Sequence, residues 1–81
     1  MKITIGKVEW MNAVARKCHP RSKTIEVVDY YFAAGYDDIN LEYNRKFDGY
    51  SNDHFNPESV ANILGYKSVR FNKDYSITAV A

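Results

Sequence analysis

Cys18 and His19 are neighbouring residues whose types could do covalent or metal chemistry, and they stand in the basic stretch RKCHPRSK. A cysteine with a histidine can act as a nucleophile and its base, or as two ligands of a zinc ion. On a helix, however, consecutive side chains diverge by about 100°, so these two would not face each other. No C-x-x-C, no H-x-x-x-H and no second cysteine completes a zinc set. We therefore expect no metal here, and we expect Cys18 to be a buried, unreactive thiol.

The rest of the sequence carries no motif of a nucleotide-binding or hydrolytic site. G-x-G-x-x-G, the P-loop, G-x-S-x-G and H-E-x-x-H are all missing. Asp37 and Asp38 are adjacent carboxylates, but directly after Gly35 they are typical of a turn. We expect a protein that is not an enzyme and that binds no cofactor.

Length and composition are those of a small intracellular domain. The 81 residues predict one compact domain, 1–81, of marginal stability, because short chains bury a smaller part of their surface. A lone cysteine excludes an internal disulfide and is typical of a reducing compartment. The sequence has neither an apolar run of about 18 residues nor the apolar region of a signal peptide at its start. We expect a cytoplasmic protein without membrane contact.

Charge is nearly balanced in total but separated along the chain. The formal net charge is +1, whereas strong nucleic-acid binders are usually clearly basic. Residues 1–25 carry six Lys or Arg and one Glu, and residues 26–43 carry five Asp or Glu and no Lys or Arg. Such segments can hold each other in the fold, or they can form two surface poles that steer a partner.

The N-terminal part of the chain predicts a strand followed by two helices. Residues 2–5, KITI, alternate β-branched side chains and predict the strand. From residue 7, the apolar side chains of Val8, Met11, Val14 or Ala15, and Cys18 recur at helical spacing, and Pro20 ends the helix. A second helix is predicted from Ser22 or Thr24 to Ala34. Because TIEVVDYYF is rich in strand-forming residues, a strand competes with that helix.

Residues 39–47 alternate apolar and polar side chains, which predicts a half-buried strand. Its inner side would carry Ile39, Leu41 and Tyr43, and these residues should be needed for folding. If one edge of this strand is exposed, it could pair with a second copy of the chain and form a homodimer.

The C-terminal part predicts a third helix and a hairpin. Asn56 is a suitable N-cap, Pro57 fits the first helical position and Gly65 suits the helix end. Two short strand-like runs flank Asn72-Lys73-Asp74 and predict a terminal β-hairpin. The sum is an α+β domain of order β-α-α-β-α-β-β.

A polar-aromatic belt over residues 36–55 is the segment whose composition exceeds what folding requires. It interleaves Tyr, Asn, Asp and Phe with one Arg-Lys pair, a composition typical of protein-recognition surfaces. A solvated loop beside an ordinary edge strand would use many of the same residues. As protein-binding residues we predict Tyr36, Asp37, Asp38, Arg45, Tyr50, Asn52 and His54.

Nucleic-acid binding or transcription modulation is the alternative function. Near residues 57–71, Ala61 and Gly65 have the spacing of a small residue and a turn glycine, and the segment resembles the start of a helix-turn-helix. The residues that follow, VRFNKDYSIT, predict strand and turn rather than a recognition helix. The basic residues that would meet nucleic acid are Arg16, Lys17, Arg21, Lys23, Lys67, Arg70 and Lys73.

In overall character the sequence is similar to small accessory proteins of bacteriophages and mobile elements, although no motif carries this likeness. Such proteins commonly bind and block a host macromolecule. The leading hypothesis is a small non-enzymatic protein that inhibits or modulates a protein partner by occupying its surface.

Overall fold

Two antiparallel sheets and two helices make up the fold over the residues that our computed structural model describes, which are 1–22, 24–33, 35–44 and 52–81. The elements follow in the order β1 (Lys2–Ile5), α1 (Lys7–Cys18), β2 (Val27–Phe32), β3 (Ile39–Tyr43), β4 (Asn52–Phe55), α2 (Pro57–Leu64), β5 (Ser68–Phe71) and β6 (Ile77–Val80). The predicted α+β class is therefore confirmed, and the order of elements is close to the predicted one.

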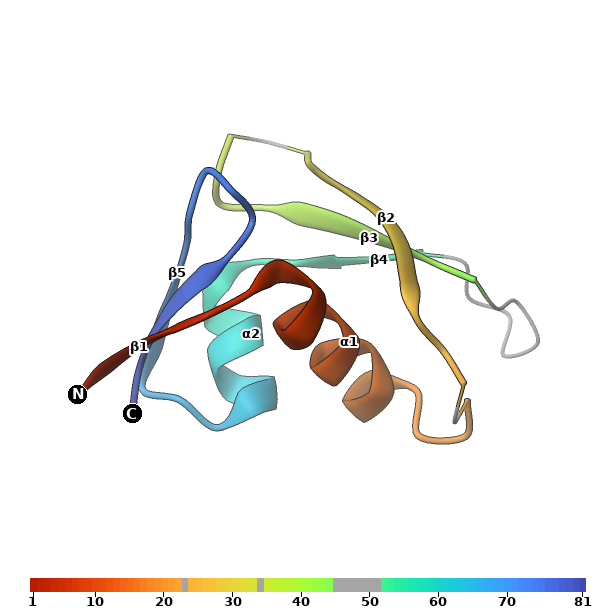
Figure 1. The fold of residues 1–81 in the computed structure, drawn as a ribbon, viewed down its shortest axis with the longest axis horizontal. Coiled ribbons are helices and arrows are strands. Elements are labelled where there is room, and N and C mark those ends of the chain that lie inside the picture. Colours follow the sequence, from red (N-terminus) through yellow and green to blue (C-terminus); the bar gives the residue numbers. More distant parts are fainter. Residues whose placement is uncertain (23, 34, 45–51) are drawn as a thin grey trace.

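The strands form a terminal sheet and a middle sheet, named for their places in the chain. The terminal sheet has the strand order β1-β6-β5, and the middle sheet has the order β2-β3-β4. All neighbouring strands are antiparallel. Figure 1 shows both helices on one side of the middle sheet, with the terminal sheet beside them. The middle sheet thus has one face toward the helices and one face away from them.

The predicted second helix is wrong, because residues 27–32 form strand β2. Here the β-branched and aromatic side chains decide the outcome, since they pack well on a pleated sheet. Tyr30 and Phe32 pack against the core while Asp29 and Tyr31 are exposed, which is the period of a strand. Gly35, expected to end a helix, lies instead in the connection to β3 with φ of 64°.

Helix α1 lies where it was predicted, and Met11, Val14 and Ala15 of the predicted apolar stripe are buried, but the ends of the stripe are not. The buried residues are Trp10, Met11, Val14 and Ala15. Val8 is 61% exposed and Cys18 is also exposed, so both were wrongly assigned to the core. Trp10, which the predicted stripe omitted, donates from Nε1 to the Tyr75 carbonyl oxygen at 2.7 Å. Burying the large Trp10 ring contributes more favourable free energy than burying a valine and a thiol. The helix is therefore rotated so that Trp10 faces the core.

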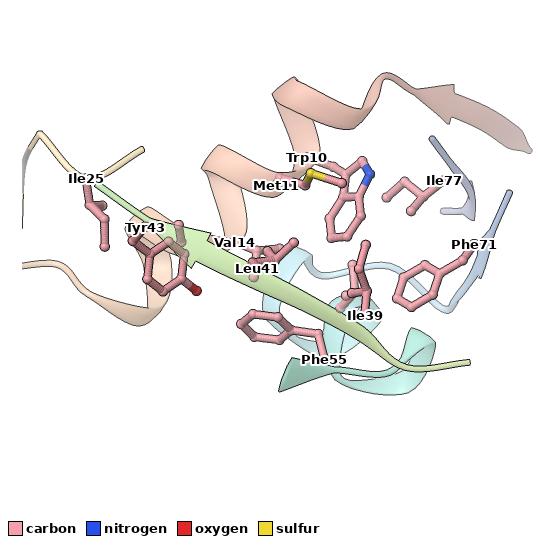
Figure 2. Packing of buried hydrophobic residues seen from close by; sticks show 12 residues of the cluster. Trp10, Met11, Val14, Ile25, Ile39, Leu41, Tyr43, Phe55, Phe71 and Ile77 are labelled. Atoms are coloured by element: carbon pink, nitrogen blue, oxygen red, sulfur yellow. The ribbon is translucent and has the colours of Figure 1, made fainter. Parts of the chain in front are cut away.

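Strand β3 is the centre of the middle sheet and carries part of the core. Ile39 and Leu41 are fully buried, and Tyr43 is nearly so, as predicted. Figure 2 shows Ile39 and Leu41 facing residues of α1, with Phe71 and Ile77 closing one end of the cluster. Because β2 and β4 occupy both edges of β3, the predicted pairing of this strand with a second copy is wrong.

Helix α2 and the C-terminal hairpin follow the sequence signals closely. Asn56 and Ser59 form a reciprocal capping box, Pro57 is the first helical residue, and Gly65 ends the helix with φ of 81°. After Gly65 the chain enters β5, which pairs with β6 as the predicted hairpin. Residues 57–71 are therefore a helix followed by a strand, and the helix-turn-helix resemblance ends there. Among the described residues, no helix has the length and apolar character needed to cross a membrane.

Candidate protein-binding face

The outer face of the middle sheet, which points away from the helices, is formed by every second residue of three strands. On β3, Asn40 and Glu42 point outward, because Ile39, Leu41 and Tyr43 point into the core. The same alternation puts Asp29 and Tyr31 of β2, and Asn52 and His54 of β4, on the outer face.

Strand register arranges these side chains in two rows. Tyr31, Asn40 and His54 are direct neighbours across β2, β3 and β4. Asp29, Glu42 and Asn52 form the adjacent row. The Asp38 carboxylate, which precedes β3, lies 3.5 Å from His54 Nδ1 and extends the outer face toward the β2–β3 connection.

The centre of the outer face holds a buried amide with an unpartnered group. Asn40 is 1% exposed, and its Oδ1 accepts a hydrogen bond of 2.9 Å from Asn52 Nδ2. Asn40 Nδ2 is buried and has no hydrogen-bond partner. Exchanging oxygen and nitrogen in both amides would keep the bond and leave Asn40 Oδ1 without a partner instead. In either orientation one polar atom of Asn40 is unsatisfied, which is unusual for a buried group.

The outer face is acidic. Asp29 and Glu42 stand directly opposite each other, an arrangement of like charges that destabilises a sheet. Together with Asp38 they place three carboxylates on the outer face, and none of the described residues of this face is Lys or Arg. Elsewhere in the described part of the chain, one ion pair joins the basic N-terminal and acidic central segments. It links exposed Arg16 and Glu26 at 4.0 Å.

Apolar surface borders the carboxylates. Tyr31 is 46% exposed and Tyr36 is 51% exposed, and the Tyr36 ring meets Phe32 edge to face at 4.9 Å. Val28 is 62% exposed at a β-bulge, where the register shifts between Val27 and Asp29. Bulges re-aim side chains and are common beside functional sites.

The structure brings part of the predicted belt to the outer face. Asp38, Asn52 and His54 belong to it, and Tyr36 and Asp37 lie exposed in the connection that leads to it. Arg45 and Tyr50 lie outside the described residues.

Sequence reasoning missed Asp29, Tyr31, Asn40 and Glu42. Had residues 27–32 been predicted as a strand, their alternation would have placed Asp29 and Tyr31 on the side opposite the core residues.

Cys18 and His19 line a second feature, an open pocket of about 290 Å³ that also includes Asp53, His54 and Phe55. His19 is 7% exposed, and its Nε2 lies 2.6 Å from Asp53 Oδ2. The Tyr43 hydroxyl donates to the same carboxylate oxygen at 2.9 Å. Burial, and then the bond to Asp53, raise the pKa of Tyr43, so its hydroxyl remains a proton donor.

The surroundings of Cys18 disfavour its thiolate form. Partial burial, and then the Asp53 charge, raise the pKa of Cys18, which lowers its thiolate fraction. Within the described ranges, no group of three or more His, Cys, Asp or Glu side chains could hold a metal ion. The bonds of Asp53 to His19 and Tyr43 connect the residue after α1, and strand β3, to β4.

The basic residues of the nucleic-acid hypothesis are distributed over two separate regions. Arg16, Lys17 and Arg21 are exposed at and after the C-terminal end of α1. Lys67, Arg70 and Lys73 are exposed around β5. Figure 1 places these two regions toward opposite sides of the molecule, and Lys23 lies outside the described residues.

No family model, curated protein or solved structure matches this chain.

Proposed function

We propose that this protein is a non-enzymatic binding protein that docks a protein partner on the outer face of its middle sheet. By occupying the partner's surface, it inhibits or modulates that partner. The observation that carries the proposal is Asn40, a buried amide with an unsatisfied group at the centre of this face. A buried donor without a partner costs about 1–3 kcal/mol, and a docked protein can supply the missing acceptor once the side chains that cover the amide move aside.

Exposed tyrosines support a protein as the ligand. Tyr31 and Tyr36 offer large, rigid contact area with polar tips, which is the property that enriches tyrosine in interfaces. Carboxylates of the outer face repel phosphate groups, so the same surface disfavours nucleic acid. A cytoplasmic location is part of the proposal, and the lone Cys18 is consistent with a reducing compartment.

The experiment is quantitative capture of the partner from extracts of the source cell, followed by affinity measurement with the purified partner. Tyr31→Ala should weaken binding by about 2 kcal/mol or more, because tyrosines near an interface centre are often hot spots. Its melting temperature should change little, since nearly half of the side chain is exposed.

Two exposed valines provide a matched control. Val28 at the margin of the outer face and Val8 on α1 are 62% and 61% exposed. Val28→Lys should reduce binding, whereas Val8→Lys should leave it unchanged. If Tyr31→Ala and Val28→Lys both bind the captured partner like the wild-type protein, the outer face is not the docking surface.

A further inference from the structure

We propose that the outer face binds an extended basic segment of the partner. An Arg or Lys side chain of this segment binds between Asp29 and Glu42, and a backbone carbonyl of the segment accepts from Asn40 Nδ2. This inference rests on the proposed function and names the chemistry of the partner.

The charge arrangement selects a cation. Asp29 and Glu42 are direct neighbours across β2 and β3, a placement in which like charges disfavour each other, and Asp29 Oδ1 accepts a hydrogen bond of 2.9 Å from the Tyr30 backbone N–H. A guanidinium or ammonium group between two carboxylates relieves this repulsion and forms charge-assisted hydrogen bonds. Among the described residues of the outer face there is no Lys or Arg, while Arg45 and Lys46, which follow β3 in the chain, lie outside the described residues. A partner supplies the cation.

Asn40 selects a hydrogen-bond acceptor next to this cation. In the orientation in which Asn52 donates to Asn40, the unpartnered atom is Nδ2, a donor, and the carboxylates near it are unfavourable neighbours for a second anion. A neutral carbonyl of a peptide backbone satisfies the donor without adding charge.

The spacing of Asn40 and Glu42 along β3 allows one extended peptide to contact both residues. Asn40 and Glu42 are two residues apart on β3, so their side chains emerge about 7 Å apart. Side chains on one side of an extended peptide repeat at the same interval. A segment lying along β3 can therefore hold a basic side chain at Glu42 while its backbone passes over Asn40.

The test uses a short synthetic peptide in which arginine alternates with glycine, titrated into the isotope-labelled protein and followed by NMR. The control peptide carries glutamine in place of arginine. We expect saturable shifts of the Asp29 and Glu42 backbone amides and of the Asn40 side-chain amide. Equal shifts at Glu9 and Glu58, exposed carboxylates in the first turns of α1 and α2, would indicate unspecific attraction and overturn the inference. An equal response to the glutamine peptide would overturn it too.

Two double variants carry the same change in charge. Asp29→Asn with Glu42→Gln should weaken peptide binding about tenfold, the combined effect expected of two exposed ion pairs. Glu9→Gln with Glu58→Gln should leave it unchanged.

Analytical ultracentrifugation of the free protein tests whether a second copy of the chain supplies the cation. Self-association that is lost in Arg16→Ala with Arg21→Ala would make a second copy the occupant and overturn the proposal.

Failure of this inference can be distinguished from failure of the proposed function. If the captured partner needs Tyr31 but binds the Asp29→Asn, Glu42→Gln variant normally, the outer face docks a protein that is not basic. If it needs neither Tyr31 nor the two carboxylates, both proposals fail.

Discussion

Replacing Asn40 by leucine should stabilise the protein while weakening partner binding. Leucine has a similar shape, and it removes the buried Nδ2 donor whose burial without a partner costs about 1–3 kcal/mol. The change also removes the bond from Asn52 Nδ2, which is worth about 0.5–1.5 kcal/mol net. Because Asn52 is exposed, its amide can bond to water, and we expect this loss at the low end. The free energy of unfolding should therefore rise by about 1 kcal/mol, or about 4–8 °C in melting temperature.

Urea unfolding and thermal melts of Asn40→Leu measure this effect, and Asn72→Leu is the matched control. Asn72 Nδ2 is fully used, since it donates to Ser76 Oγ and Thr78 Oγ1 at 3.1 Å each. Removing these bonds should destabilise the protein by about 1–2 kcal/mol. If Asn40→Leu is destabilising like Asn72→Leu, the Asn40 amide is satisfied in solution and the reasoning about the outer face is refuted.

Two further predictions concern the core and the thiol. Leu41→Ala should cost about 2–5 kcal/mol of stability because the side chain is fully buried, whereas Val28→Ala should change stability by less than about 0.5 kcal/mol. Similar urea midpoints for these two variants would contradict the assigned core. Cys18, although exposed, should react with a thiol reagent at pH 8 more slowly than a cysteine in a peptide, because its raised pKa keeps the thiol protonated. Asp53→Asn should lower that pKa and speed the reaction, and a wild-type rate at or above that of the peptide would show that the assigned pKa direction is wrong.

Local signals in the sequence predicted the elements that have strong end signals. Asn56, Pro57 and Gly65 each favour a helix end through their own backbone and side-chain chemistry, so α2 could be placed without knowledge of its neighbours. Around residues 27–32, Thr24 and Gly35 also resemble helix-end signals, but the apolar residues between them fit a helix or a strand. Pairing with β3 decides between them, and that pairing joins residues distant in the chain.

The predicted belt stays a prediction, and the structure places only part of it on the outer face. The composition of residues 36–55 directed attention to Asp38, Asn52 and His54, which do share the outer face. Their neighbours Asp29 and Tyr31 come from an earlier segment, and strand register alone puts them beside Glu42 and Asn40.

The sequence by itself determined the α+β class, the absence of recognisable catalytic motifs, the caps of α2, the C-terminal hairpin and the inward side of β3. Each of these depends on residue type or on short-range periodicity. Only the tertiary structure decided that α1 buries Trp10 rather than Val8, and that Asp29 opposes Glu42. The tertiary structure also decided that the Asn40 amide is buried with its Nδ2 group unpaired. These outcomes depend on which distant elements meet, because burial, like-charge contact and hydrogen-bond satisfaction are properties of neighbours in space.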